Sequence, residues 1–107
     1  MDIKNWKELE TIPMFDLVSR KSYSGKNITV ARVELGRGST VAGHQHPNEQ
    51  ITVVLSGRLI FTGANEERTA VAGDIVFTPA EAYHAVSALE DSVVLDIFSP
   101  IRSDWSK

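Results

Sequence analysis

The sequence predicts an all-β domain built as a sandwich or barrel. Short runs rich in Val, Ile, Thr and Phe alternate along the whole chain with clusters of Gly, Asn, Asp and Pro. No segment shows a convincing helical period, and there is no repeat, linker or low-complexity tract. Short strands separated by frequent turn residues are typical of sandwiches and barrels rather than of α/β folds.

Eight strands follow from the runs of β-branched and aromatic residues between turn signals. They are residues Phe15 to Arg20, Ile28 to Leu35, Gln50 to Leu55, Arg58 to Thr62, Arg68 to Val71, Asp74 to Thr78, Ala82 to Ala88 and Ser92 to Phe98. Ser56-Gly57 predicts a tight hairpin, and residues 63–65 predict a longer one. Residues 1–10 form at most a short terminal helix or an arm.

Length and composition limit the possible classes of protein. A chain of 107 residues with 42% hydrophobic and 23% charged residues predicts one globular domain covering residues 1–107. A net charge of −3 without a basic stripe argues against nucleic-acid binding. We expect no membrane association and a cytoplasmic protein, because there is neither a leader-like N-terminus nor an apolar run long enough to span a bilayer. With no cysteine, any metal must be held by nitrogen and oxygen atoms.

Two strands carry patterns that bear on function. In residues 50–55, Gln50, Thr52 and Val54 share one face, and the opposite face, with Ile51, Val53 and Leu55, is predicted to be the drier one. In residues 92–98, Asp96 interrupts a nearly continuous apolar run. A buried carboxylate is costly unless it has a partner, so Asp96 requires an explanation.

The segment HQHPNEQ, residues 44–50, predicts a metal site. His44 and His46 are two positions apart, so in an extended segment both side chains point to the same side. Together with Gln50 and the third histidine, His84, they offer three nitrogen ligands and one oxygen ligand. Such a set suits a divalent transition metal such as Ni, Zn, Mn, Fe or Co. The alternative is that these histidines are solvated or hydrogen-bonded structural residues.

The spacing of these residues resembles the two motifs of the cupin family. Five residues separate Gly38 from His44, and His46, Gln50 and Gly57 follow at the spacing of the first motif. Gly73, Pro79 and His84 match the second motif. Gln50 stands where the family usually has glutamate, Glu81 where it usually has glycine, and Ala88 where it often has asparagine. The resemblance implies a single-domain jelly-roll β-barrel. A neutral amide in place of a carboxylate leaves the metal about one charge more positive, which favours an anionic ligand.

A narrower resemblance, to the KdgF family of pectin-degradation cupins, covers nearly the whole chain. It rests on HQHPNEQITVVLSGRL, on AGD at residues 72–74 and on the C-terminal LDIFSPIRSDW. It implies a metal held by His44, His46, Gln50 and His84, and it places the functional D-x-F-x-x-x-R signature on Asp96, Phe98 and Arg102.

The activity that this resemblance implies is a metal-dependent linearisation of unsaturated monouronates from pectin or alginate to 4-deoxy-5-keto-uronate. Asp96 would be the general acid and base, Arg102 would bind the substrate carboxylate, and Phe98 would form the pocket wall. The resemblance also implies a homodimer formed through edge strands, to which Trp6 and Phe15 could contribute.

Other interpretations of the same residues stay open at this point. Asp96 could be paired structurally with an arginine, Arg102 could lie along the surface, and Phe98 could be an ordinary core residue. At the level of function, the rivals are a cupin dioxygenase or other oxygen-activating metal enzyme, and a non-catalytic sugar-binding or effector-binding cupin.

Overall fold

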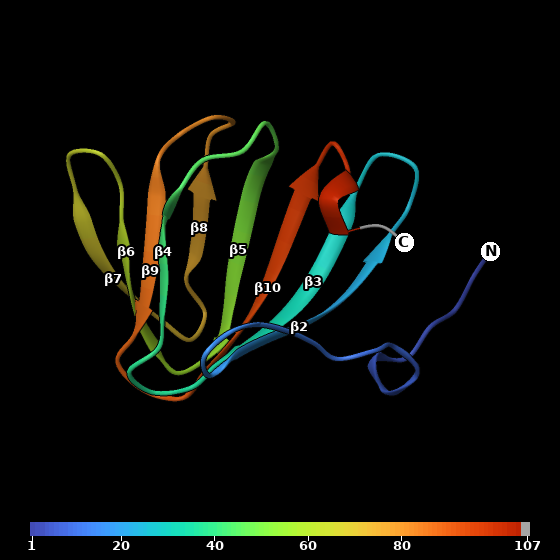
Figure 1. Cartoon of the computed structure of the whole chain (residues 1–107), viewed down its shortest axis with the longest axis horizontal. Helices are drawn as coiled ribbons and strands as arrows, with labels where there is room; N and C mark the ends of the chain where they lie inside the picture. The colour runs from blue at the N-terminus through green and yellow to red at the C-terminus, as the bar shows by residue number, and fades with distance from the viewer. Residues whose placement is uncertain (106–107) are drawn as a thin grey trace.

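The computed structural model describes residues 1–105, and within them ten strands form two antiparallel sheets (Figure 1). The strands are β1 (Ile12–Phe15), β2 (Val18–Ser24), β3 (Thr29–Leu35), β4 (Thr40–His44), β5 (Glu49–Ser56), β6 (Arg58–Thr62), β7 (Glu67–Val71), β8 (Ile75–Thr78), β9 (His84–Ala88) and β10 (Ser92–Ser99). Two short 3₁₀ helices, η1 (Trp6–Glu8) and η2 (Ser103–Trp105), lie near the ends of the chain.

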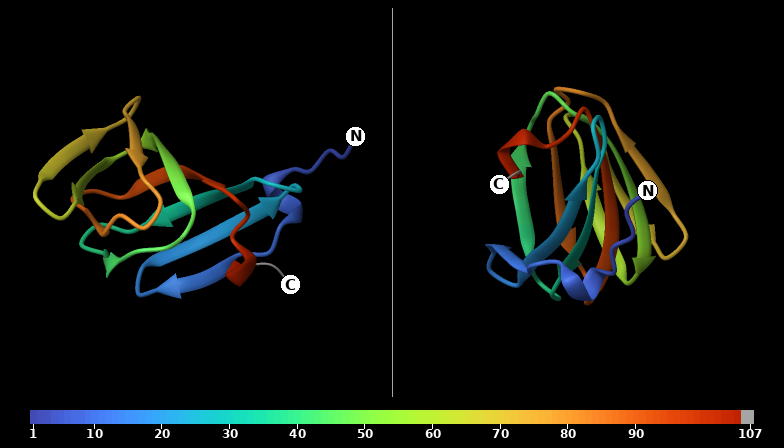
Figure 2. Two further views of the ribbon diagram at one scale, coloured as in Figure 1. Left: turned by 90° about the horizontal axis from the view of Figure 1, so that it is seen from above. Right: turned by 90° about the vertical axis from the view of Figure 1, so that its right-hand side faces the viewer.

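The larger sheet has the order β1-β2-β3-β10-β5-β8, and the smaller sheet has the order β4-β9-β6-β7. The two sheets face each other and enclose the core between them (Figure 2). Val33, Val54, Leu59, Val94 and Phe98 are among the buried residues of that core. This architecture confirms the predicted all-β jelly-roll fold.

The predicted strands are found with shifts of a few residues at their ends, except at the N-terminus. The predicted strand from Phe15 to Arg20 is wrong, because a turn at Asp16-Leu17 divides it into β1 and β2. Leu17 has a φ of 63°, a left-handed conformation that no strand contains. The terminal helix is present as η1, which Asn5 and Glu8 close with a reciprocal capping box.

The facing predicted for residues 50–55 is also wrong. Gln50, Thr52 and Val54 are buried, whereas Ile51 and Leu55 are exposed by 41% and 47%. The reason is that the first two inward side chains of β5, Gln50 and Thr52, are polar and line the cavity, whereas only Val54 belongs to the apolar core. A period of two identifies which residues share a face, but it does not show which face is inside when polar residues line a site.

An apolar surface lies on the outside of the larger sheet at its β5–β8 edge. Ile51 pairs with Phe77 and Val53 with Ile75 across the two strands. Ile51, Leu55, Ile75 and Phe77 are all exposed, and we call these four residues the apolar outer face. No helix among the described residues is long and apolar enough to cross a membrane.

One end of the sandwich gathers all the side chains that the sequence singled out. Strands β4, β8 and β10 end there, and β5 and β9 begin there (Figure 1). His44 is the last residue of β4 and His84 is the first of β9, and these two pair across the smaller sheet. Gln50 pairs with Phe98 across the larger sheet. Both sheets therefore contribute to one site.

Candidate functional site

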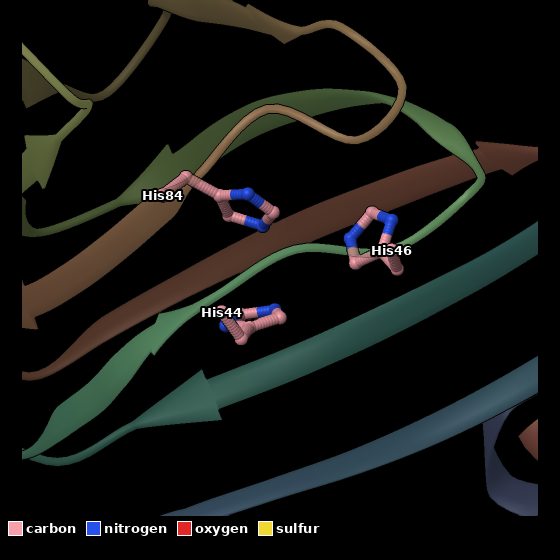
Figure 3. Close-up of side chains that lie close together, drawn as sticks. All are labelled: His44, His46 and His84. Carbon is pink, nitrogen blue, oxygen red and sulfur yellow. The ribbon is translucent and has the colours of Figure 1, made fainter.

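The three histidines lie together, as their spacing and the topology predict. Their ring centroids are 5.5 Å apart for His44 and His46, 4.3 Å for His44 and His84, and 4.9 Å for His46 and His84. One nitrogen atom from each ring can be chosen so that all three lie within 4.8 Å of one another. Figure 3 shows the rings approaching from the end of β4, from the β4–β5 loop and from the start of β9. The cluster is a candidate site for a divalent metal.

Backbone carbonyl groups fix the orientation of each ring. Nδ1 of His44 lies 2.9 Å from the Ala42 oxygen, Nδ1 of His46 lies 3.0 Å from the Asn48 oxygen, and Nδ1 of His84 lies 2.9 Å from the Ala82 oxygen. A carbonyl oxygen only accepts, so each Nδ1 carries the hydrogen, and in a neutral ring the lone pair is on Nε2. Metal-binding histidines are held by such contacts.

Two properties of these rings favour a metal over a purely structural role. Burial lowers the pKa of His46 and of His84, which keeps both imidazoles neutral and able to bind a cation. Among the described residues, Nε2 of His84 is buried without any hydrogen-bond partner. A buried lone pair without a partner is costly, and a metal ion would satisfy it.

Gln50 directs its amide oxygen toward the same point. Its Nε2 donates to Oγ1 of Thr52 and to Oδ1 of Asp96, each at 3.0 Å. The oxygen Oε1 then lies 3.1 Å from Nε2 of His46. With the ring hydrogen of His46 on Nδ1, both atoms present lone pairs, and a cation between them would satisfy both. The donor set of three imidazoles and one amide oxygen therefore fits a divalent transition metal.

Asp96 lies beside this donor set, with its carboxylate held by side chains of β5. Oδ1 accepts a 2.6 Å hydrogen bond from Thr52 and the 3.0 Å bond from Gln50. Burial raises the pKa of Asp96, and the bonds from Thr52 and Gln50 and the charge of Arg102 act in the opposite direction. The cost that the sequence indicated for a carboxylate in this strand is thus offset by two donors, and the group stays close to the candidate metal centre.

Phe98 and Arg102 lie against each other in the wall of the same cavity. The Phe98 ring is 2% exposed and meets the His46 ring edge-on at a centroid distance of 5.7 Å. Cζ of Arg102 lies 4.8 Å from the Phe98 centroid, and Arg102 is buried rather than extended along the surface. Nε and Nη2 of Arg102 donate to the two oxygens of Asp104, at 3.0 and 2.8 Å. Asp96, Phe98 and Arg102 all line the cavity.

The sequence reasoning missed three residues of this region. Thr52 shares a face with Gln50, so the period of two could have identified it. Asn48 is buried, and its Nδ2 donates to the carbonyl oxygens of Pro100 and Ile101 at 2.6 and 3.0 Å. Trp105 of η2 packs against Phe98 with ring centroids 5.1 Å apart. No local pattern indicated Asn48, because its partners lie 52 and 53 positions further along the chain, and the contact of Trp105 depends on how the chain turns after β10.

Two turns explain residues of the motifs: the β5–β6 turn at the far end of the sandwich requires Gly57, and the turn before β9, beside the site, contains the departure at Glu81. Gly57 has a φ of 91°, and a Cβ there would lie 2.5 Å from the Asp91 oxygen. Glu81 has a φ of 64°, in the region that favours glycine, which is the residue that the cupin pattern has there. Its backbone N–H donates to the His46 oxygen at 2.8 Å. The strained turn therefore supports the histidine loop.

Fold, motif glycines and histidine cluster together define the class of this protein. Residues 31–98 match the family described as the cupin domain, and the chain belongs to that family. Nearly the whole chain is also similar to KdgF proteins. It is 29% identical to the pectin degradation protein KdgF of Dickeya dadantii over 103 residues, covering 94% of this chain and 89% of the relative. The structure of KdgF from Halomonas sp. superposes with a TM-score of 0.88 at 30% identity, covering 94% of this chain and 95% of the other.

Two further matches extend this picture without adding an activity. An uncharacterised protein of Streptomyces coelicolor is 32% identical over 79 residues, which is 73% of this chain and 75% of the relative. An RmlC-like cupin from Shewanella frigidimarina superposes with a TM-score of 0.92 at 19% identity, covering 99% and 96% of the two chains. At that identity the likeness concerns the fold alone.

Proposed function

We propose that this cupin is a metal-dependent enzyme that linearises 4,5-unsaturated monouronates, released from pectin or alginate, to 4-deoxy-5-keto-uronate. The observation that carries the proposal is the carboxylate of Asp96, which lines a cavity beside a donor set that fits a divalent metal. Similarity to KdgF along nearly the whole chain supports the substrate class.

The reaction requires proton transfer and no oxidant. Opening the ring breaks the bond between C1 and the ring oxygen and removes the proton of the C1 hydroxyl, which leaves an aldehyde and an enolate. A proton then enters at C4, and the enolate becomes the 5-ketone, so the overall change is an isomerisation. Asp96 is assigned as the group that accepts one proton and delivers the other. Its contacts with Thr52 and Gln50 fix the carboxylate for both steps.

The remaining residues bind and orient the sugar. Arg102 is assigned to the substrate carboxylate because its planar fork matches carboxylate geometry, and Phe98 forms the wall beside it. His44, His46, Gln50 and His84 would hold the metal, which supplies a Lewis acid for the substrate oxygens when bound. Burial of Phe98 and Arg102 over the cavity limits access of water.

The test compares wild-type protein with Asp96→Asn on an unsaturated monouronate generated by a lyase. Loss of the ultraviolet absorbance of the conjugated enol ether reports the reaction, and elemental analysis of the same samples reports the metal. Asp96→Asn should lower the rate by about 10²–10⁴-fold, because an amide cannot transfer the proton. Asp16→Asn, at an exposed turn, is the matched control and should keep wild-type activity.

The outcomes separate this proposal from its rivals. The reaction and the role of Asp96 are both supported if wild type and Asp16→Asn turn over the substrate and Asp96→Asn does not, while all three still bind metal. Metal-loaded wild type that leaves the absorbance unchanged contradicts the proposal. Oxygen consumption would then favour an oxygen-activating cupin, and binding of a sugar without turnover would favour a non-catalytic one.

A further inference from the structure

Arg20 carries a second guanidinium group and lies beside three residues that line the cavity, Val18, Val33 and Trp105. It lies on β2 two positions after Val18, which is buried in the core, so both side chains leave the strand on the inner face. Its register partner on β3 is the buried Val33. The side chain of Arg20 is half-buried, although arginine on a strand usually faces water.

Trp105 brings Arg20 and Arg102 together. Cζ of Arg20 lies 4.1 Å from the centroid of the Trp105 ring, and Cζ of Arg102 lies 4.1 Å from the same ring. Both contacts are close enough for a cation–π interaction. Two cations thus share one aromatic ring, and that ring itself lines the cavity.

The charges of this group are only partly balanced by the carboxylates near it. Asp104 engages Arg102 through both of its oxygens. Nε of Arg20, by contrast, is buried without a hydrogen-bond partner within residues 1–105. Burial and the charge of Arg102 lower the pKa of Arg20, with Asp104 acting in the opposite direction. A buried guanidinium donor beside a second cation is costly unless an anion joins them.

We propose that Arg20 is a further substrate-binding residue, which together with Arg102 forms a two-guanidinium site for the carboxylate of an anionic sugar. The choice of a sugar acid as the anion rests on the proposed function. Arginine provides the planar donors that carboxylates require, and the Trp105 ring offers an apolar face for a sugar beside them. The proposal assigns specificity for uronates over neutral sugars to Arg20 as well as to Arg102.

The alternative role for Arg20 is packing, in which its side chain only supports Trp105. The two roles differ in their dependence on the charge of the ligand. We therefore compare binding of D-galacturonate and D-galactose, which differ in having a carboxylate or a hydroxymethyl group, by calorimetry on metal-loaded protein. The variants are Arg20→Gln and Arg20→Lys. The control is Arg32→Gln, which removes an arginine from the outer side of β3, where it pairs with Glu34.

Wild type should prefer the uronate, and Arg20→Gln should reduce that preference by about tenfold, the size of one charge-assisted hydrogen bond. Arg20→Lys should keep part of the preference because the charge remains. Arg32→Gln should match wild type. On the unsaturated monouronate, Arg20→Gln should raise KM and leave kcat nearly unchanged, as expected for a group that binds the substrate and the transition state alike.

The inference would be overturned if both Arg20 variants kept the wild-type preference for galacturonate over galactose, or if they lost affinity for both sugars equally. Arg20 would then be a packing residue. Turnover by wild type with an unaltered KM in Arg20→Gln contradicts the inference but not the proposed function. If galacturonate binding depends on Arg20 but wild type does not turn over the unsaturated monouronate, the binding role of Arg20 stands and the proposed function is contradicted. A wild type that neither binds the uronate nor turns it over contradicts both.

Discussion

At the scale of single residues, Gln50 shows why an amide suits this site better than the glutamate of the usual cupin pattern. The amide has two different ends. Its oxygen points toward His46 and its nitrogen donates to Asp96 and Thr52, so one side chain connects the donor set with the carboxylate. A glutamate offers oxygen at both ends and cannot donate to Asp96 when ionised.

Replacing Gln50 with Glu should therefore separate metal binding from catalysis. The new carboxylate keeps an oxygen for the metal, but it removes a hydrogen bond from Asp96 and places a like charge within contact distance. We expect Gln50→Glu to retain metal and to lower turnover at least about tenfold, because one lost hydrogen bond is worth about 1–3 kcal/mol. Gln45→Glu, at an exposed position in the same loop, is the control. Full activity in Gln50→Glu would contradict the role given to its amide nitrogen.

The sequence predicted the residues of the histidine cluster because motif spacing is a local property, and the topology then brings them together. It did not predict the contacts of Arg102 with Asp104 and Trp105, since these depend on how the chain turns after β10. Thr52 was predictable only in part. Its position on the strand was predictable, but its hydrogen bond to Asp96 depends on the pairing of β5 with β10.

At the scale of elements, the β4–β5 loop and the segment after β10 behave as one unit because Asn48 joins them. Its backbone oxygen faces Nδ1 of His46, and its side chain donates to Pro100 and Ile101, one residue before Arg102. The placement of a histidine of the cluster and the placement of the arginine therefore depend on the same buried residue.

Asn48→Ala should destabilise the protein by about 2 kcal/mol, since it removes the two hydrogen bonds that the buried Asn48 side chain donates to the carbonyl oxygens of Pro100 and Ile101. It should also raise KM, because the segment that carries Arg102 loses its anchor. Asn48→Asp, which is nearly the same size but lacks the N–H donors, should behave like Asn48→Ala. Urea unfolding and steady-state kinetics measure both effects. Asn65→Ala, in an exposed hairpin, should stay within about 0.5 kcal/mol of wild type. Stability of Asn48→Ala in that same range would refute the link.

Two strands escaped prediction for identifiable physical reasons. β1 contains Pro13, which normally argues against a strand and is tolerated here because β1 lies at the edge of its sheet. β4 contains Gly43, whose sequence signal is weak, and a Cβ at that position would meet the Tyr83 ring, with its oxygen 1.8 Å away. Both exceptions come from neighbours in space, which a pattern of residue types does not contain.

At the scale of the whole molecule, the end of β5 that reaches the site reverses the usual pattern. Its inward side chains Gln50 and Thr52 are polar because they form the site, and the outer face is apolar where β5 joins β8. β8 is also the edge strand of the larger sheet, so the apolar outer face adjoins a row of unpaired backbone groups. This surface is a better candidate for the expected homodimer contact than the N-terminal segment with Trp6 and Phe15.

We therefore expect a second copy of the chain to cover the apolar outer face, since large exposed apolar patches usually mark interaction sites. Sedimentation equilibrium should show a dimer for wild type and a monomer for Phe77→Lys. Leu89→Lys replaces another exposed apolar residue, in the turn before β10 and outside the apolar outer face, and should remain dimeric. A dimeric Phe77→Lys would place the dimer contact elsewhere on the molecule. A wild type that is monomeric at all concentrations would show that no dimer forms.

The distribution of the donor set along the chain bears on when a metal can enter. His84 lies 38 positions after His46, and the two meet only when β4 and β9 have paired in the smaller sheet while β5 has joined the larger one. In an unfolded chain that arrangement is rare, because closing such a loop costs entropy before any contact forms. The folding rate should thus be independent of metal concentration, while the unfolding rate falls as metal is added. Selection among metals is then made by a finished cavity of fixed geometry and not by a flexible peptide.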